Sequence, residues 1–386
     1  DNNMSISENV GGMSRYLAGL RTADIYTGLK KGVTEVLHRV PIVGDSMIKK
    51  IRKTKSSIKQ LVVPGMFFED MGITYLGPVP GHNIPLLCRA FREARKVEGP
   101  VLLHVITEKG KGYGPAEEHP DKFHGIGPFQ IETGEPEVPK KKDTYTDVFG
   151  KVLCDEARNR PEIAAITAAM ADGTGLARFR QLYPKRFFDV GIAEGHGVTF
   201  AAGLAAGGIH PVFAVYSSFL QRAYDQLIHD VALQNLPVIL AVDRAGLVGS
   251  DGETHQGIFD ISYLSSIPNM TVMSPKHKWE LADMLRFALD YHCPIALRYP
   301  RGEAYDGYQE FREPIAYGKS EMLYRESEIA ILFAGHMFEP AVRVRDMLKE
   351  RGYSCTLVNA RFLKPIDEER VDDLCKDHRL IVTIEE

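Results

Sequence analysis

The sequence between residues 143 and 299 alternates short apolar runs with longer stretches in which apolar residues recur at helical spacing. Short apolar runs of this kind predict buried β-strands, and the longer stretches predict amphipathic helices. The expected strands are 163–167, 187–190, 211–216, 237–242, 270–273 and 294–299, and the expected helices include 147–159, 220–234, 259–266 and 278–291. Regular alternation predicts right-handed βαβ units in a parallel sheet, which is an α/β fold.

Residues 187–203 contain the most informative break, because a short strand is followed at once by a helix. One carboxylate, Glu194, lies at this break, and ligands of parallel α/β sheets collect beyond the carboxyl ends of the strands. Its neighbours, among them Ile192 and Phe200, are apolar or small. We therefore expect a buried carboxyl that keeps or shares a proton and faces a basic ring nitrogen. The alternative is a carboxylate that only complements the helix dipole.

The regions on either side predict two further units. In the first we expect a helix at 14–39, a tight loop at 77–83, a strand buried on both faces at 100–107, and a linker at 133–143. In the last we expect strands 329–333, 354–358 and 380–384 with helices 339–351 and 367–376. The sequence thus predicts three parallel-sheet βαβ domains, at 1–142, 143–315 and 316–386, of which the first and third are incomplete.

Composition excludes several classes of function. A chain of 386 residues that is 44% hydrophobic can build two or three domains with their own cores. Its net charge of −4 gives no general attraction to nucleic acid or to anionic membranes, and the basic run 49–55 is interpreted as a solvated helix face. Five widely spaced cysteines argue against a zinc site and a disulfide framework, and favour a reducing cytoplasm. No apolar run approaches the roughly 20 residues of a membrane helix.

Polar and aromatic side chains gather in three loops that follow strands of the middle region. These loops carry Tyr216, Phe219, Arg244, Asp251, His255 and Arg301. Because the carboxyl ends of parallel strands meet at one edge, we expect these side chains on the same rim as Glu194. Two arginines can make forked contacts to a phosphate, and Asp251 can tune His255 for proton transfer. Taken singly, each has a plainer interpretation as a salt-bridged arginine, a structural histidine or a core aromatic residue.

Four long motifs, at residues 1–11, 216–225, 243–257 and 299–302, relate the chain to a known family. With them the chain resembles, from end to end, the 1-deoxy-D-xylulose-5-phosphate synthases, which are thiamine-diphosphate enzymes of the transketolase superfamily. The resemblance implies a thiamine-diphosphate-binding fold of the transketolase type. In that fold, residues 1–142 are the C-terminal part of the diphosphate-binding domain plus a linker, 143–315 the pyrimidine-binding domain, and 316–386 the start of the C-terminal domain.

The resemblance also implies which residues bind the cofactor. Asn2 matches an asparagine that binds Mg²⁺ beside the diphosphate, and Met4 matches a residue that adds a backbone oxygen to the metal. Glu194 matches the glutamate that hydrogen-bonds the aminopyrimidine ring and promotes its imino form. Phe219 matches the aromatic residue that packs on this ring, and Lys109 matches a site residue of the first domain.

A second group of residues is implied on the substrate side, namely Tyr216, Arg244, Asp251, His255 and Arg301, together with His124 of the first domain. The two arginines match the pair that grips the phosphate of D-glyceraldehyde 3-phosphate, with Tyr216 beside them. Asp251 and His255 match the polar pair near the reacting carbons, so that His124, Asp251 and His255 join Glu194 as the expected catalytic residues.

The implied reaction condenses pyruvate with D-glyceraldehyde 3-phosphate. Carbon dioxide leaves pyruvate, the thiazolium ring holds the electrons as an enamine, and addition to the aldehyde gives 1-deoxy-D-xylulose 5-phosphate, a precursor of isoprenoids, thiamine and pyridoxal phosphate. The resemblance further implies a homodimer, and composition places it in the cytoplasm without a nucleic-acid or membrane partner.

The sequence departs from the family pattern at several points. Gly195 and Gly197 stand where Gln and Ala are usual, which is expected to loosen the helix start, and Pro80 replaces a frequent acidic residue. The Gly-Asp-Gly half of the cofactor motif and two substrate-side histidines do not occur in the chain, so we expect it to be a fragment, or an ordered remainder, of a longer enzyme and inactive alone. The alternatives are a transketolase, a 2-oxo acid dehydrogenase component, or a fragment that only binds a partner.

Overall fold

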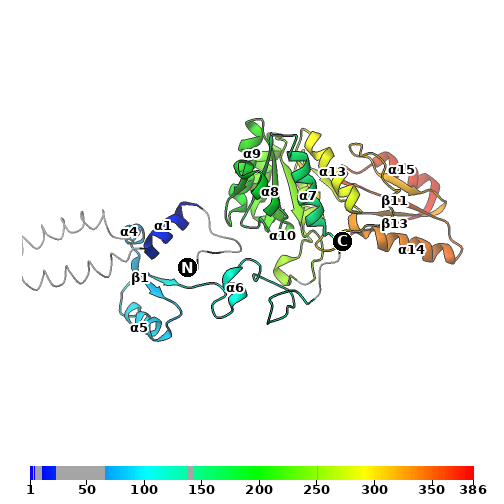
Figure 1. The fold of residues 1–386 in the computed structure, drawn as a ribbon. Helices are drawn as coiled ribbons and strands as arrows, with labels where there is room; N and C mark the ends of the chain where they lie inside the picture. The colour runs from blue at the N-terminus through cyan, green and yellow to red at the C-terminus, as the bar shows by residue number, and fades with distance from the viewer. Residues whose placement is uncertain (3, 5–10, 23–65, 138–141, 250) are drawn as a thin grey trace, which may run out of the picture. The chain divides into compact units, whose positions relative to one another are not determined.

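The computed structural model describes residues 1–2, 4, 11–22, 66–137, 142–249 and 251–386. The chain divides into two units, Asp1–Val138 and Pro139–Glu386, hereafter unit 1 and unit 2 (Figure 1). Each has its own sheets. The predicted basic run 49–55 and most of the predicted helix 14–39 lie outside the described residues.

Unit 1 holds a pair of parallel strands with short helices around it. Its described elements are α1 Gly12–Thr22, α4 Met66–Asp70, β1 Thr74–Pro80, α5 Ile84–Ala94, β2 Val101–Ile106 and α6 Gly114–Glu118. Strand β2 confirms the strand expected at 100–107. Its residues are half-buried, and only His104 among them is buried, so the expectation of burial on both faces is wrong.

The predicted loop at 77–83 is also wrong over its first half, because β1 continues to Pro80. Prolines lack the N–H group that a strand donates, which is why Pro78 and Pro80 favour a loop interpretation. In the structure the register with β2 shifts between Leu76 and Val79, so the strand passes Pro78 at an irregularity and pairs again at Val79. Asn83 then caps α5 by accepting a hydrogen bond from the Leu86 N–H at 3.1 Å.

Unit 2 is built on a seven-stranded sheet of order β12-β7-β8-β6-β5-β3-β4. Its strands are β3 Ile163–Thr167, β4 Phe187–Asp189, β5 His210–Tyr216, β6 Ile239–Asp243, β7 Thr271–Met273, β8 Ile295–Arg298 and β12 Phe362–Lys364. The first six of these strands match the expected strands to within two residues and run parallel. Residues Tyr216 and Asp243 pair in register, so the strands that precede the predicted site loops end side by side.

Helices cover both faces of this sheet (Figure 1). On one face α7 Tyr145–Ala157, α8 Ala177–Leu182 and α13 Lys278–Asp290 bury apolar side chains against alternate strand residues. Helix α7 begins where it does because Thr144 and Asp147 form a reciprocal capping box. On the other face α9 Glu194–Ala206 packs so closely on β5 that a Cβ atom at Gly197 would lie 2.8 Å from the Phe213 ring.

The helix expected at 220–234 is more broken than predicted. It begins earlier, as α10 Ser217–Leu220, and continues through a 3₁₀ turn and α11 Tyr224–Gln226 into a π-helix at Leu227–Ala232. The expected helices at 259–266 and 278–291 are confirmed as α12 Asp260–Ser266 and α13. π-Helical turns are rare and often lie at functional sites.

The last part of unit 2 forms a four-stranded sheet of order β13-β10-β11-β9. Its elements are β9 Glu321–Tyr324, β10 Glu328–Phe333, α14 Phe338–Glu350, β11 Cys355–Asn359, α15 Glu368–Asp377 and β13 His378–Ile384. The predicted strands and helices are confirmed, but β9 and β12 were not predicted and both run antiparallel to their neighbours. The other strand pairs of both sheets are parallel, so the expected α/β fold with parallel-dominated sheets is confirmed. Strand β12 leaves this region and joins the seven-stranded sheet.

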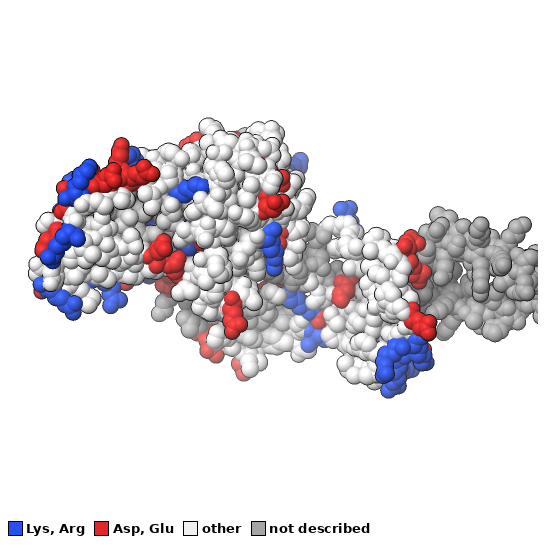
Figure 2. All heavy atoms as spheres, turned by 180° about the vertical axis from the view of Figure 1, so that it is seen from behind, with Lys and Arg blue, Asp and Glu red and all other residues white. Residues whose placement is uncertain are grey.

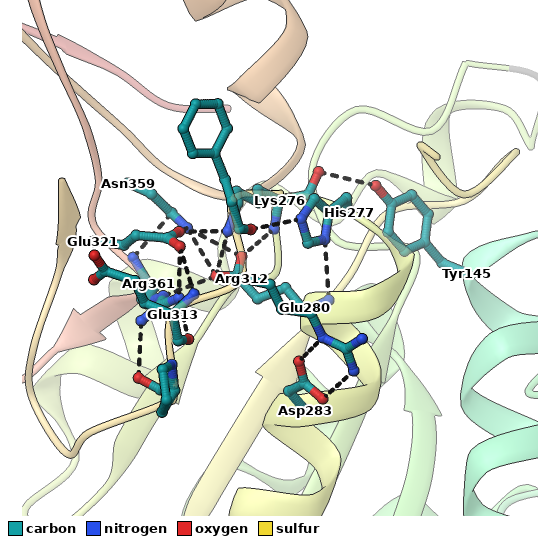
Figure 3. A network of polar contacts seen from close by, with 12 residues as sticks. Tyr145, Lys276, His277, Glu280, Asp283, Arg312, Glu313, Glu321, Asn359 and Arg361 are labelled. Carbon is teal, nitrogen blue, oxygen red and sulfur yellow. Dashed lines mark hydrogen bonds and ion pairs between the residues drawn. The ribbon is translucent and has the colours of Figure 1, made fainter. Parts of the chain in front are cut away.

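A buried network of charges joins the two sheets of unit 2 (Figure 3). Lys276 and Glu280 belong to the seven-stranded side, and Glu321, Asn359 and Arg361 to the four-stranded side. The Lys276 Nζ lies 2.9 Å from Glu280 Oε1 and 2.5 Å from Glu321 Oε2. Arg361 pairs with the same two carboxylates, at 2.8 and 3.0 Å. Two cations thus balance two anions whose side chains are at most 2% exposed.

All five cysteines are free. No helix in the described parts of the chain is both long and apolar enough to cross a membrane.

Candidate functional site

The turn between β4 and α9 places Glu194 at the first position of a helix. Asp189, the last residue of β4, shapes the turn by accepting hydrogen bonds from the N–H groups of Ala169 and Gly191 at 2.8 and 2.9 Å. Gly191 has a φ of 71°, a conformation that glycine adopts at little cost. The Glu194 carboxylate therefore lies at the positive end of the helix dipole, and the residue is only 3% exposed.

The predicted burial of Glu194 is confirmed, but its surroundings differ from those expected. Ile192, expected to bury it, is itself 64% exposed. Instead Arg222 donates a hydrogen bond to Glu194 Oε1 at 2.5 Å and lies over the Phe219 ring, 4.9 Å from its centroid. Whether Glu194 keeps or shares a proton stays a prediction. Arg222 lies in the motif at residues 216–225, but no role was predicted for it. Its position three residues after Phe219, which is helical spacing, was the available signal.

Three predicted rings form one cluster next to this pair. The Phe219 ring stacks on Tyr216 with centroids 5.6 Å apart, and His255 meets Phe219 edge-on at 5.2 Å. Tyr216 ends β5 and begins the turn into α10, whereas His255 closes a 3₁₀ turn in the loop after β6. Burial raises the pKa of Tyr216 to about 12, so its hydroxyl is protonated and can donate a hydrogen bond.

Arg244 is held firmly by internal contacts. Its guanidinium lies over the Tyr216 ring at 4.1 Å, pairs with Asp243 at 3.0 Å, and donates to the Gly173 carbonyl at 2.7 Å. Burial raises the pKa of Asp243 although Arg244 opposes this shift. With a side chain only 14% exposed, Arg244 presents a limited surface to a ligand.

Asp251 lies between the two arginines that were predicted to bind phosphate. One carboxylate oxygen is 3.2 Å from Arg301 Nη1 and the other is 3.8 Å from Arg244 Nε. The Arg301 side chain is 39% exposed, and it borders a cavity of about 450 Å³ that Leu247 and His336 also line. Arg301 is thus the arginine that a small phosphate ester can reach more easily.

A continuous chain of contacts therefore joins all seven predicted site residues of unit 2. It runs from Glu194 through Arg222 to Phe219, Tyr216 and His255, and from Tyr216 through Arg244 and Asp251 to Arg301. The residues come from loops after four strands, as the parallel topology predicts. Their grouping is confirmed, and their individual roles stay predictions.

Unit 1 brings together two further predicted residues. The Lys109 Nζ lies 3.1 Å from His124 Nδ1. Burial lowers the pKa of Lys109, against the opposing charge of Asp121, and burial together with the Lys109 charge lowers the pKa of His124. At neutral pH His124 is therefore a neutral imidazole able to accept a proton, which suits an acid–base role.

Asn2 and Met4 lie at the edge of the β1–β2 pair. Asp1 extends the pair, because its nitrogen donates to the Val105 carbonyl at 2.6 Å and its carbonyl accepts from Thr107. Asn2 Oδ1 accepts a hydrogen bond from the Met4 N–H at 3.0 Å, so the two predicted metal ligands lie next to each other. An amide oxygen and a backbone carbonyl are ligands that suit Mg²⁺.

A buried relay beside this turn was not predicted. His104 is hydrogen-bonded through Nδ1 to the Tyr75 hydroxyl at 2.7 Å and through Nε2 to Asp1 at 3.0 Å. His104 lies in a strand of apolar residues. The sequence pattern of such a strand does not tell whether a histidine belongs to the core or to a site. The relay holds the residue that precedes Asn2.

The described residues fit the pyrimidine end of thiamine diphosphate. A carboxylate that is buried at a helix start, next to a partly exposed phenylalanine ring, can meet a ring nitrogen and stack on a heterocycle. Buried oxygen atoms of Ser218 and Gln226 have no hydrogen-bond partner among the residues that the structure describes. These atoms mark polar surface that a polar ligand would satisfy.

The helix at Glu194 is not loosened by its two glycines, contrary to expectation. Helix α9 is continuous from Glu194 to Ala206. Gly197 is needed for close packing on Phe213, and a Cβ atom at Gly195 would lie 3.2 Å from Gln226 Oε1. Glycine here allows tight contact between α9 and its neighbours.

Three family models match the chain. The one described as 1-deoxy-D-xylulose-5-phosphate synthase matches residues 1–107. The transketolase pyrimidine-binding domain matches residues 141–306, and the transketolase C-terminal domain matches residues 318–386.

Curated relatives match over the whole chain. The protein named 1-deoxy-D-xylulose-5-phosphate synthase in Lachnoclostridium phytofermentans is 54% identical over 386 residues, which is 100% of this chain and 62% of that protein. Its namesake in Natranaerobius thermophilus is 52% identical over 391 residues, with the same shares. The chain thus spans 62% of the length of both relatives.

Solved structures share the fold. One described as a split gene transketolase, inactive beta4 tetramer, has a TM-score of 0.58 and 26% identity, covering 64% of this chain and 80% of that chain. A transketolase from Campylobacter jejuni has a TM-score of 0.54 and 18% identity, covering 83% of this chain and 64% of that chain.

Proposed function

Because the chain belongs to the thiamine-diphosphate-dependent family of 1-deoxy-D-xylulose-5-phosphate synthases, we propose that its complete gene product condenses pyruvate with D-glyceraldehyde 3-phosphate. Carbon dioxide is lost and 1-deoxy-D-xylulose 5-phosphate is formed. The observation that carries the proposal is the chain of contacts from Glu194 to Arg301, which joins a candidate cofactor carboxylate to a candidate phosphate-binding arginine.

Glu194 and Phe219 hold the aminopyrimidine ring in this proposal. The buried carboxylate hydrogen-bonds a ring nitrogen, and the phenylalanine packs on the ring face. Bound thiamine diphosphate supplies the carbon nucleophile and the electron sink that loss of carbon dioxide from a 2-oxo acid requires. When the ring binds, Arg222 has to give up its hydrogen bond to Glu194. The Arg222 side chain is 55% exposed, so it can move into solvent.

Mg²⁺ binds Asn2 and the Met4 carbonyl in this proposal, together with the diphosphate. Lys109 lies beside His124, and a cation there favours the negative charge of a diphosphate. The oxygen atoms of Asn2 and Met4 are hard ligands that suit Mg²⁺, and the positive charge of Lys109 suits the diphosphate.

On the substrate side, Arg301 and Arg244 bind the aldehyde phosphate. Asp251 holds Arg301 in place before the substrate arrives, and His255 moves protons at the reacting oxygen atoms. His124 is the proposed acid–base residue of unit 1. The cavity beside Arg301 gives a phosphorylated three-carbon aldehyde room to enter.

Replacing Arg301 with Ala is expected to raise the KM for D-glyceraldehyde 3-phosphate about 10- to 100-fold, since a charged hydrogen bond contributes about 1.5–3 kcal/mol. The KM for pyruvate is expected to change less than about twofold. Steady-state kinetics of the complete gene product measure both. Arg325→Ala is the matched control, because Arg325 is 65% exposed and pairs with Asp377 at a distance from the site. Equal effects on both substrates would remove Arg301 from the phosphate site.

A transketolase activity is the second candidate, because the solved structures that share the fold are transketolases. The two activities differ in the donor substrate, which is pyruvate for the synthase and a ketose phosphate for a transketolase. Product formation from pyruvate and no transfer from a ketose phosphate supports the synthase, and the reverse preference supports a transketolase. For the 386-residue chain by itself we propose no activity.

We propose a homodimer in the cytoplasm that binds neither nucleic acid nor membrane. Exposed apolar residues of the site turns and loops, among them Ile192, Leu247 and Phe259, support an interface with a second copy. On the face seen in Figure 2, acidic and basic side chains of unit 2 are interspersed, which gives little attraction to a polyanion.

A further inference from the structure

The loop after β6 is closed at its base by glycines. Gly246 and Gly257 exchange two backbone hydrogen bonds of 2.8 Å, so residues 247–256 form a separate excursion. Within it the Gln256 side chain accepts from the Val248 N–H and donates to the Gly252 carbonyl, both at 2.8 Å. This excursion, hereafter the 247–256 loop, carries Asp251 and His255.

The end of β13, in the other sheet, reaches the base of this loop. Glu386 Oε1 accepts a hydrogen bond from the Leu247 N–H at 2.8 Å, although the two residues are 139 positions apart. The Ala334 N–H donates to the Ile384 carbonyl, which continues the β10–β13 ladder to within two residues of Glu386. The Glu386 side chain is only 11% exposed. A carboxylate of the C-terminal sheet is thus inserted against the backbone of a site loop.

Polar groups surround this carboxylate. The His336 Nε2 lies 2.7 Å from Glu386 Oε2, off the direction of a hydrogen bond. Arg298 pairs with Asp260 at 3.1 Å on the adjoining side, and its Nη2 has no hydrogen-bond partner in the described parts of the chain. Burial, with a contribution from Arg298, lowers the pKa of His336 to about 4, so this imidazole is neutral at pH 7. Burial raises the pKa of Glu386, against its hydrogen bond from Leu247 and the Arg298 charge.

The loop backbone is fitted to Glu386. A Cβ atom at Gly246 would lie 2.2 Å from Glu386 Oε2, closer than any nonbonded contact allows. Gly246 also has a φ of 78°, which disfavours other residues. Glycine at 246 is therefore required twice, once by the backbone and once by the carboxylate.

We infer that Glu386 is a positioning residue for the 247–256 loop: its carboxylate, held by the C-terminal sheet, sets where Asp251 and His255 meet the phosphorylated aldehyde. The identity of the substrate in this inference rests on the proposed function. The attachment of the 247–256 loop to Glu386 is independent of that function. It gives the C-terminal sheet a part in the site although none of the predicted site residues belongs to that sheet.

In the complete gene product, Glu386→Ala is expected to raise the KM for D-glyceraldehyde 3-phosphate about tenfold, the effect of losing one hydrogen bond to a charged group. The KM for pyruvate is expected to stay within about twofold. Hydrogen exchange of peptides that span 246–257 is expected to become at least about tenfold faster. Glu386→Gln keeps an acceptor for the Leu247 N–H and is expected to restore both measurements.

Glu385→Ala is the matched control, since Glu385 is the neighbouring residue and is exposed. Unchanged exchange at 246–257 in Glu386→Ala, or a Gln variant as impaired as the Ala variant, would overturn the inference. If the wild type forms no product, the proposed function fails, and exchange still decides whether Glu386 holds the loop. Should Glu386→Ala not fold, Glu386→Asp probes the same contact, because it withdraws the carboxylate by one methylene group: faster exchange at 247–256 supports the inference, and wild-type exchange overturns it.

Discussion

Glu194→Gln is expected to lower the kcat of the complete gene product by about 10²- to 10⁴-fold, the range for losing a group that transfers or positions a proton. Glutamine has nearly the same shape, so the turn after β4 and the packing of α9 should persist. What is lost is the carboxylate that we propose for the ring nitrogen of the cofactor. Initial rates of product formation, with thiamine diphosphate and Mg²⁺ at saturation, measure the change.

Glu368→Gln is the matched control for this prediction. Glu368 is also the first residue of a helix, α15, but it is exposed and distant from the site loops in the sequence. If Glu194 only complements the helix dipole, both variants will lose similar small amounts of stability, of the order of 0.3–1 kcal/mol, and keep their activity. Full activity of Glu194→Gln would therefore reject its assigned role.

Lys276→Met is expected to lower the free energy of unfolding by about 3–5 kcal/mol, as for other buried ion pairs that lose one partner. The substitution leaves Glu280 and Glu321 with one cation, Arg361, in a site that water does not reach. Adding Glu321→Gln restores neutrality and should recover part of the loss. Denaturant unfolding of the four proteins of this cycle measures the coupling.

The exposed pair Arg312–Asp283 is the matched control on the same helix (Figure 3). Its side chains are 37% and 25% exposed, so Arg312→Ala is expected to cost no more than about 1 kcal/mol. A comparable loss in both variants would mean that the buried network contributes no more than a surface pair.

The network also predicts a pH dependence. Burial alone would raise the pKa of Glu280, but Lys276 and Arg361 outweigh it and lower this pKa to about 2, from an ordinary value of 4.5. A carboxyl whose pKa is lower in the folded chain stabilises the fold fully above its unfolded pKa. This contribution should be lost as the pH falls from 4.5 toward 2, and Glu280→Gln should flatten that part of the profile.

Much of the fold followed from periodicity, because long alternating patterns depend on burial alone. The strands of the middle region were placed to within two residues. Strands β9 and β12 were not predicted because they lie outside the alternation of strands and helices, and their pairing is decided by partners far along the chain. Strand β1 was not predicted because a register shift accommodates its prolines, and no local sequence pattern reveals that shift.

The site was predicted as a set of residues, because parallel topology places the loops after neighbouring strands together. Its electrostatics could not be predicted. Arg222 reaches Glu194 only through the turn from α10 to α11, and Glu386 reaches Leu247 from another sheet. Both contacts depend on three-dimensional packing between segments whose sequences carry no mutual signal.

The central claim is tested most directly by measuring carbon dioxide release from pyruvate by the complete gene product with thiamine diphosphate and Mg²⁺. We expect slow release with pyruvate alone and strongly accelerated release, with formation of 1-deoxy-D-xylulose 5-phosphate, when D-glyceraldehyde 3-phosphate is added. No release under either condition, together with transfer from a ketose phosphate, would contradict it.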